Sequence, residues 1–151
     1  MNDIFSELFS RYPCLEKCGE AMEQALEQLT ASFSAGGKLL LCGNGGSAAD
    51  CEHIVGELMK GFLKKRPLSP EIQAAMQAAN PALDTALFAR LQGGLPAISL
   101  TGAPALSTAF ANDVDPDLIF AQQLLALGRS GDVLLGISTS GNAKNVCAAA
   151  Q

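Results

Sequence analysis

The sequence predicts an α/β fold in which helices cover both sides of a parallel, doubly wound sheet. Short apolar runs bounded by glycine or polar residues, typical of strands buried on both faces, alternate with longer segments of helical periodicity. The 151 residues, 48% of them hydrophobic, are enough for one domain with a core and too few for two ordinary ones. We therefore expect a single domain over residues 1–151.

Two helices are predicted before the first strand. The first carries Ile4, Phe5 and Leu8 and stops before Pro13, which cannot continue it. The second ends near residues 36–37 and carries an apolar stripe at helical spacing: Leu15, Met22, Leu26, Leu29 and Phe33. This stripe either faces the core or, because it is close to a heptad pattern, packs against the same helix of another copy.

The first strand is predicted over residues 38–43, and a helix follows it. Ser47 is expected at the N-cap of that helix with Asp50 at N3, close to a capping box. The basic triplet 64–66 should end the segment, either as a solvated helix end that complements the dipole or as a phosphate contact.

An insertion of two helices is predicted at about residues 68–93. Ser69 and Pro70 open the first helix as cap and N1 residue. Asn80 and Pro81 repeat this pattern for a second helix, which should end near Gly93.

Two further strands complete the predicted sheet, separated by helices. The predicted elements, in order, are a strand at 95–101, helices at about 105–112 and 118–128, and a strand at 133–137. Only three strands can be counted, so the sheet is expected to be incomplete at the C-terminus or completed by another chain. An open edge beside residues 133–137 invites such pairing.

Composition narrows the function classes. Fifteen acidic against ten basic residues give a net charge of −5, which disfavours nucleic acid and anionic membranes as partners. No apolar run reaches about 20 residues and the amino terminus lacks a basic start, so we expect a cytoplasmic protein. Five cysteines without a Cys-x-x-Cys pair suggest free thiols in a reducing compartment, and none is assigned to metal or catalysis.

Two loops at strand ends carry hydroxyl groups and glycines. Ser138, Thr139 and Ser140 follow the third strand, and residues 43–47 follow the first, so both loops are expected where open α/β sheets bind ligands. Small donors, close backbone approach and a helix N-terminus all favour a phosphate. The glycine loop formally matches a dinucleotide fingerprint, but residues 61–66, where the ribose-binding acid should stand, contain none.

His53 and Glu57 are four residues apart and so project from one face of the predicted helix. Such a pair can bind a divalent metal, or the glutamate can act as a base beside the imidazole. A lone histidine on a helix is more often structural, and two ligands are incomplete for zinc.

Four motifs resemble those of the sugar isomerase (SIS) domain family, and specifically its phosphoheptose isomerase branch. They are the glycine loop 41–47, the pair His53 and Glu57, the pair Asn112 and Asp113, and the segment 131–142 that ends in Ser-Thr-Ser-Gly-Asn. The resemblance runs from about residue 15 to the end. It implies a three-layer α/β/α sandwich, usually a tetramer with active sites at subunit interfaces, that interconverts sedoheptulose 7-phosphate and manno-heptose 7-phosphate.

The resemblance also implies a role for each matching residue. Glu57 would be the base that moves a proton between C1 and C2 through an enediol, His53 would assist it, and both would be zinc ligands. The other matches would bind substrate: Ser138, Thr139 and Ser140 the phosphate, Asn44, Gly45, Gly46 and Ser47 from the opposing loop, and Asn112 and Asp113 the sugar hydroxyls.

Three features depart from the family. The insertion between Pro67 and Gly94 is longer than in the enterobacterial type of enzyme. Ala143 stands where the branch commonly has a further serine, and the glutamine and histidine that complete the family's metal and acid site are expected beyond residue 151. We therefore expect these residues to bind a sugar phosphate without turnover, and the full-length protein to be an isomerase that self-associates as a dimer or tetramer. The alternative is a noncatalytic SIS-domain binding or regulatory protein, such as the replication-initiation regulators.

Overall fold

A three-stranded parallel sheet forms the centre of the protein. The computed structural model describes residues 3–151, and the strand order is β2-β1-β3. The strands are β1 (Leu39–Gly43), β2 (Ala97–Ser99) and β3 (Val133–Ile137). Leu39 pairs with Ala97 on one side and with Val133 on the other. All three strands lie in predicted segments, and β1 is buried throughout, which explains its continuous apolar sequence.

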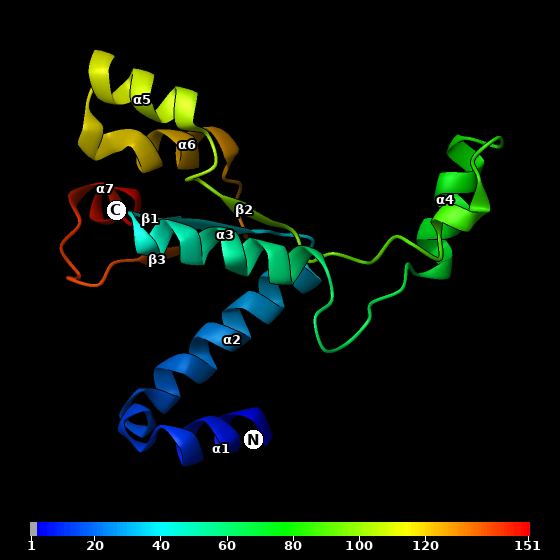
Figure 1. Cartoon of the computed structure of the whole chain (residues 1–151), viewed down its shortest axis with the longest axis horizontal. Coiled ribbons are helices and arrows are strands. Elements are labelled where there is room, and N and C mark those ends of the chain that lie inside the picture. The colour runs from blue at the N-terminus through cyan, green and yellow to red at the C-terminus, as the bar shows by residue number, and fades with distance from the viewer. Residues whose placement is uncertain (1–2) are drawn as a thin grey trace.

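Helices cover both faces of the sheet (Figure 1). The helices against it are α2 (Gly19–Ser34), α3 (Gly46–Met59), α6 (Ile119–Leu127) and α7 (Lys144–Ala149). Leu39 and Leu41 of β1 share a core with Cys51 of α3 and the end of α2. The alternate residues Leu40 and Cys42 pack on the other face against α6 and α7. The predicted three-layer α/β/α arrangement is confirmed.

The chain before β1 folds into two helices and a turn. Before α2 come α1 (Asp3–Arg11) and the 3-10 turn η1 (Pro13–Cys18). The first helix agrees with the prediction. The second was placed too early, because residues 13–18, which include Leu15, form the 3-10 turn η1 and α2 begins only at Gly19. Leu29 and Phe33 of the apolar stripe pack on the sheet, whereas Leu26 is 42% exposed. The stripe therefore forms core at one end and open surface at the other.

α3 begins earlier than predicted. Its N-cap is Gly45, whose φ of 56° glycine adopts without strain, and Ser47 is buried inside the first turn. The prediction that Ser47 caps the helix with Asp50 at N3 was wrong, because the left-handed turn at Gly45 starts the helix sooner.

α3 also ends earlier than predicted, at Met59. The triplet 64–66 does not end the helix but lies in the connection that follows it. Arg66 nevertheless returns to the helix, where its guanidinium donates hydrogen bonds to the carbonyl oxygens of Leu58 at 2.5 Å and Gly93 at 2.9 Å. It thereby satisfies a carbonyl at the C-terminus of α3, as the dipole interpretation of the triplet requires.

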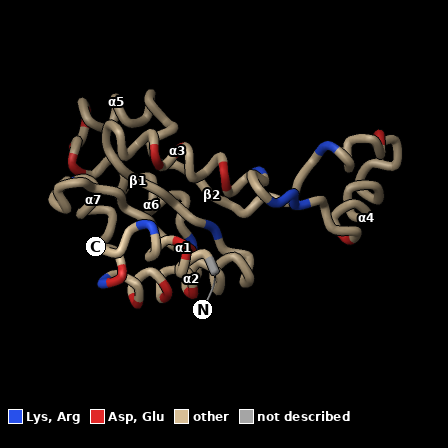
Figure 2. The backbone as a smooth tube through the Cα atoms, turned by 60° about the horizontal axis from the view of Figure 1, so that its bottom comes forward, with Lys and Arg blue, Asp and Glu red and all other residues tan. Residues whose placement is uncertain are grey.

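Residues 68–93 stand away from the sheet in both views (Figure 1, Figure 2). They contain α4 (Pro70–Ala79), which begins as predicted, because the Ser69 hydroxyl accepts a hydrogen bond from the amide of Ile72 at 3.3 Å. An isolated antiparallel bridge between Pro67 and Gln92 closes the base of this segment.

The prediction of a second helix in this segment was wrong. Only the 3-10 turn η2 (Thr85–Leu87) forms there. The Asp84 carboxylate accepts a hydrogen bond from the amide of Ala86 at 2.9 Å, and the Asn80 side chain accepts one from Ala82 at 3.2 Å. These local bonds favour turns over a helix.

The rest of the chain follows the predicted order. After β2 come α5 (Pro104–Asp113), the 3-10 turn η3 (Pro116–Leu118), α6, β3 and α7. β3 is an edge strand, as expected. Within residues 3–151, no helix has the length and apolar character needed to cross a bilayer.

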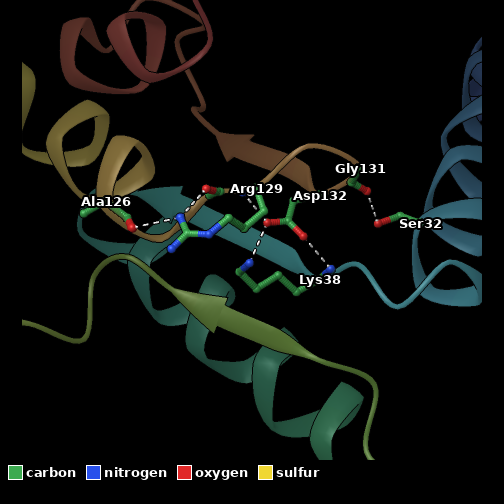
Figure 3. Close-up of polar contacts among 7 residues, drawn as sticks. Ser32, Lys38, Ala126, Arg129, Gly131 and Asp132 are labelled. Carbon is green, nitrogen blue, oxygen red and sulfur yellow. Dashed lines mark hydrogen bonds and ion pairs between the residues drawn. The ribbon is translucent and has the colours of Figure 1, made fainter.

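A polar cluster closes the amino end of the sheet (Figure 3). The Asp132 carboxylate pairs with the Lys38 ammonium at 2.5 Å and accepts hydrogen bonds from the amides of Lys38 and Arg129. The hydrogen bond from the Lys38 side chain, followed by those backbone bonds, holds the pKa of Asp132 below its usual range. Ser32 donates to the carbonyl oxygen of Gly131 at 2.6 Å, which ties α2 to the start of β3.

Candidate functional site

The loops that follow β1 and β3 lie side by side at the carboxyl end of the sheet. Their strands are parallel neighbours, and Gly43 at the end of β1 pairs with Ile137 at the end of β3. The side-chain amides of Asn44 and Asn145 exchange two hydrogen bonds, of 2.8 and 2.9 Å. This pair holds the first turn of α7 against the glycine loop, so the two loops form one site.

A cavity of about 210 Å³ opens between these loops. Its lining residues are Asn44, Ser47, Ile137, Ser138, Thr139, Ser140 and Ala143. The structure thus brings together the predicted side chains of both loops. Because small-molecule pockets usually begin at about 300 Å³, the cavity suits one end of a ligand, such as its phosphate, rather than a whole sugar.

The loop after β3 is ordered by its own hydrogen bonds. The amide of Gly141 donates to the carbonyl of Ser138 at 3.2 Å, and the amide of Asn142 donates to the Ser140 hydroxyl at 3.2 Å. The hydroxyls of Ser138 and Ser140 are 3.5 Å apart. Within residues 3–151, the hydroxyls of Ser47 and Thr139 have no hydrogen-bond partner, so they can donate to a ligand.

The glycines of the first loop bring backbone close to the cavity. A Cβ on Gly43 would lie 2.9 Å from the Cβ of Ser47, so only glycine lets the strand end meet the helix start this closely. Gly45 and Gly46 do not line the cavity. Their position at the start of α3 nevertheless offers amide groups to an anion.

His53 and Glu57 lie on α3 but outside the cavity. His53 is exposed, and the Glu57 side chain is 34% exposed with one carboxylate oxygen 3.3 Å from the Lys60 ammonium. Ten residues separate Glu57 from Ser47, which is about 15 Å along a helix axis. A single chain does not bring the predicted base to the phosphate loop.

Asn112 and Asp113 form the end of α5 and are exposed. The Asn112 amide donates a hydrogen bond to the Asp113 carboxylate at 2.7 Å. Neither residue lines the cavity. Their predicted contact with sugar hydroxyls stays a prediction.

The donors needed for zinc do not assemble within one chain. His53 and Glu57 are a two-donor set on one helix, and residues 3–151 hold no group of three or more His, Cys, Asp or Glu side chains that suits a metal ion. Zinc takes three or four protein ligands. The two residues alone therefore do not fit a complete zinc site.

Two buried cysteines, Cys42 of β1 and Cys51 of α3, are poor nucleophiles. Burial, together with the neighbouring Cys51, raises the pKa of the Cys42 thiol to about 11, and burial also raises that of Cys51. Both thiols therefore stay protonated at neutral pH.

A larger cavity, of about 390 Å³, lies beside the open edge of β3. Leu124, Leu125 and Leu134 contribute much of its wall. Unlike the cavity between the two loops, it is not lined by several hydroxyl groups. We interpret it as a gap beside the uncovered edge of the sheet.

Asn145 is the structural residue of the site that sequence reasoning missed. It stands 101 positions from its partner Asn44, and only the pairing of β1 with β3 reveals that they meet. A polar residue in the first turn of the last helix was the one available signal.

Comparisons with known proteins agree with this geometry. Residues 13–93 match the family described as SIS domain. The phosphoheptose isomerase of Desulfovibrio desulfuricans is 43% identical over 122 residues, which cover 81% of this chain and 46% of that protein. The phosphoheptose isomerase of Thiobacillus denitrificans is 38% identical over 137 residues, which cover 91% of this chain and 56% of that protein. The chain spans about half the length of the curated relatives it matches.

Two solved structures have the same fold. The structure of phosphoheptose isomerase from Neisseria gonorrhoeae matches with a TM-score of 0.67 at 35% sequence identity. The match covers 97% of this chain and 62% of the gonococcal chain. That of a phosphoheptose isomerase from Francisella tularensis gives 0.65 at 28% identity, with 99% and 69% covered.

Proposed function

The chain belongs to the SIS domain family, and on that premise we propose that the protein binds a phosphorylated sugar and interconverts sedoheptulose 7-phosphate and manno-heptose 7-phosphate. The observation that carries the proposal is the hydroxyl-lined cavity between the two loops at the carboxyl end of the sheet. The names of the relatives support the same reaction.

In the proposed complex the phosphate occupies this cavity. Ser138, Thr139 and Ser140 donate to its oxygens from one side, and Ser47 and the start of α3 donate from the other. Neutral donors with a helix N-terminus suit a dianion, because hydrogen bonds to a charged acceptor are stronger than those between neutral groups.

Glu57 is the proposed base. It removes a proton from C1 of the ketose while the C2 carbonyl oxygen gains one, which gives an enediol. Glu57 then delivers the proton to C2 while the hydroxyl on C1 loses its proton, so the carbonyl moves from C2 to C1 and the atoms balance. His53 assists at the oxygens, and Asn112 and Asp113 hold sugar hydroxyls.

This assignment requires more than one copy of the chain. The distance along α3 between Glu57 and the phosphate loop supports a site built at an interface between copies, and the exposed end of the α2 stripe offers a surface for association. We therefore infer a homo-oligomer, a dimer or tetramer, whose subunits each hold residues 1–151 as one domain with an insertion at about 68–93.

Zinc and location complete the proposal. His53 and Glu57 would be two ligands of a zinc ion, which would polarise the carbonyl oxygen. The free thiols support a cytoplasmic setting.

Solvent deuterium exchange tests the reaction. The full protein is mixed with sedoheptulose 7-phosphate in D₂O, and NMR measures aldose formation and deuterium at C1 and C2. Glu57→Gln should abolish both while phosphate binding persists. The matched control is Glu52→Gln, an exposed carboxylate on the same helix, which should keep activity within about threefold, a change below 1 kcal/mol.

A second candidate is a noncatalytic sugar-phosphate-binding protein. The position of Glu57 outside the cavity of its own chain favours it. Binding of the heptose phosphate with no conversion and no deuterium uptake, with or without added zinc, would replace the isomerase proposal with this one.

A further inference from the structure

Arg66 joins both ends of the insertion to the last turn of α3. Its Nε donates a hydrogen bond to the carbonyl oxygen of Gly93 at 2.9 Å, and its Nη2 donates to that of Leu58 at 2.5 Å. The same Nη2 also donates to the carbonyl oxygen of Glu57 at 3.5 Å. Arg66 and Gly93 are 27 positions apart. One side chain therefore connects the end of α3 with the start and the end of the insertion.

The carbonyl groups of this turn need partners from outside the helix, because the last four carbonyls of an α-helix have no donor within it. Those of Glu57 and Leu58 accept from Arg66, and that of Leu58 also accepts from the amide of Leu95 at 2.9 Å. A guanidinium suits this place, because its charge complements the negative helix pole and its planar fork donates in two fixed directions. A lysine ammonium would supply the charge without the fork.

The backbone around Arg66 is closely packed. The amide of Gly93 donates a hydrogen bond to the Arg66 carbonyl at 2.7 Å, so the two residues bond to each other through backbone as well as side chain. A Cβ on Gly94 would lie 2.9 Å from the carbonyl oxygen of Met59, the last residue of α3. The base of the insertion thus packs directly on the end of the helix.

The carboxylate of Glu57 depends on the backbone of this turn for its position. Its one ion pair within residues 3–151 is with Lys60, at 3.3 Å, and the Lys60 side chain is 58% exposed. Exposed pairs of this kind contribute little, so they do not fix a side chain. Glu57 directly precedes Leu58, whose carbonyl Arg66 binds. A displacement of about 1 Å in a catalytic group can lower a rate by roughly a hundredfold.

We propose that Arg66 is a positioning residue for Glu57, which fixes the last turn of α3 and, through its backbone, the place of the carboxylate. The catalytic part of this inference rests on the proposed isomerase function. Arg66 does not line the cavity between the two loops, and its hydrogen bonds go to backbone oxygens. Its loss should therefore slow proton transfer and leave phosphate binding unchanged.

Kinetics of the full protein test this role. Arg66→Ala should lower kcat for sedoheptulose 7-phosphate by about thirtyfold, while KM and the affinity for inorganic phosphate stay within about twofold of wild type. Arg66→Lys keeps the charge and should recover kcat to within about fivefold of wild type. Calorimetric titration with inorganic phosphate counts the folded sites, so kcat is expressed per folded site.

Arg129→Ala is the matched control. The Arg129 guanidinium also donates to carbonyl oxygens at a helix end, those of Ala126 and Gly128 beside α6. It lies far from Glu57 in the sequence and makes no contact with α3 among the hydrogen bonds of residues 3–151. We expect kcat of this variant to stay within about twofold of wild type.

Hydrogen exchange gives a measure that needs no turnover. In the full protein with Arg66→Ala, the amides of residues 58–60 and of Leu95 should exchange at least about tenfold faster than in wild type, and those of β1 should not change. Unchanged exchange in this turn, an unchanged kcat, an equal loss of kcat in Arg129→Ala, or a loss of phosphate affinity as large as that of kcat would overturn the proposal. A wild type that binds but does not convert the heptose phosphate would refute the proposed function. The exchange rates alone would then decide whether Arg66 fixes the turn that carries Glu57.

Discussion

Polar residues at the two ends of the sheet differ in whether their hydrogen bonds are satisfied within the chain. At the amino end, Lys38, Asp132 and Ser32 are paired with one another or with backbone. At the carboxyl end, Ser47 and Thr139 line a cavity, and their hydroxyls have no hydrogen-bond partner in the described chain. Polar residues at strand ends thus indicate a ligand site only where the fold leaves their hydrogen bonds unmade.

Helix direction explains the difference. Helices end near the amino end of the sheet, and Arg129 donates to the carbonyl oxygens of Ala126 and Gly128 at the end of α6. Helices begin at the carboxyl end, where α3 starts at Gly46 beside the cavity. The negative helix poles are neutralised by cations of the chain, whereas the positive poles have no acidic residue in the cavity lining and remain available to an anion.

The largest effect should come from breaking the amino-end cluster. Asp132→Ala removes a carboxylate whose side chain is 7% exposed and leaves the Lys38 ammonium without its partner. We expect a loss of about 3 kcal/mol in the free energy of unfolding, measured with urea. Asp117→Ala, which breaks the exposed pair with Lys144, should cost below about 1 kcal/mol. Equal losses would show that the cluster contributes no more than a surface pair.

The same cluster makes stability depend on pH. Because the pKa of Asp132 is lowered in the folded state, its contribution is complete above the ordinary aspartate pKa of about 4 and is lost as pH falls through the folded value. The difference in unfolding free energy between wild type and Asp132→Asn should therefore be greatest at neutral pH and shrink below about pH 4. A difference that grows on acidification would contradict this.

At the carboxyl end, a change should affect binding and spare stability. Thr139→Val removes a cavity hydroxyl that has no hydrogen-bond partner in the described chain, so affinity for inorganic phosphate or a sugar phosphate should fall about tenfold, measured by calorimetry. Unfolding free energy should change by less than about 0.5 kcal/mol. Ser130→Ala, an exposed serine at the amino end, is the control and should alter neither. A larger effect of Ser130→Ala on binding would reverse the assignment of the two ends.

Most of the fold was predictable, because its signals are local. The continuous apolar sequence of β1 indicates a strand buried on both faces, and Ser69 with Pro70 marks the start of α4. The errors arose where one local preference outweighed another. A positive φ at Gly45 displaced the expected cap at Ser47, and the side chain of Asp84 stabilised a turn in place of a helix.

The site was predictable only in part, because it depends on strand order. Two loops that follow parallel strands lie at the same edge of the sheet, at the carboxyl ends of the strands. This explains why Ser47 shares a cavity with Ser138 to Ser140. The contact between Asn44 and Asn145 requires knowing that β1 and β3 are neighbours. The relation of Glu57 to the cavity depends on assembly, which the periodicity of one helix does not specify.

Separating the two loops should give an intermediate effect. Asn44→Ala removes both hydrogen bonds to Asn145 and leaves the Asn145 amide exposed to solvent. Exposed neutral bonds contribute little each, so we expect a loss of about 1 kcal/mol in unfolding free energy and a few-fold loss of phosphate affinity. Asn142→Ala is a useful comparison, because its side chain contacts only its own loop. If phosphate affinity falls equally in both, the bridge between loops has no special part in the site.

The smallest effect should come from adding a hydroxyl to the carboxyl end. Ala143 lines the cavity and is also the N-cap of α7, where no side chain caps the helix. Ala143→Ser should stabilise the protein by at most about 1 kcal/mol if the new hydroxyl accepts from the first turn. The amide of Val146 already donates to the Asn145 side chain at 3.0 Å, so the capping position is largely taken. We therefore expect the hydroxyl to serve the ligand, with phosphate affinity raised a few-fold and unfolding free energy nearly unchanged. A gain in stability with no gain in phosphate affinity would mean that a hydroxyl at this position caps the helix. The carboxyl end would then resemble the amino end, where polar groups stabilise the fold.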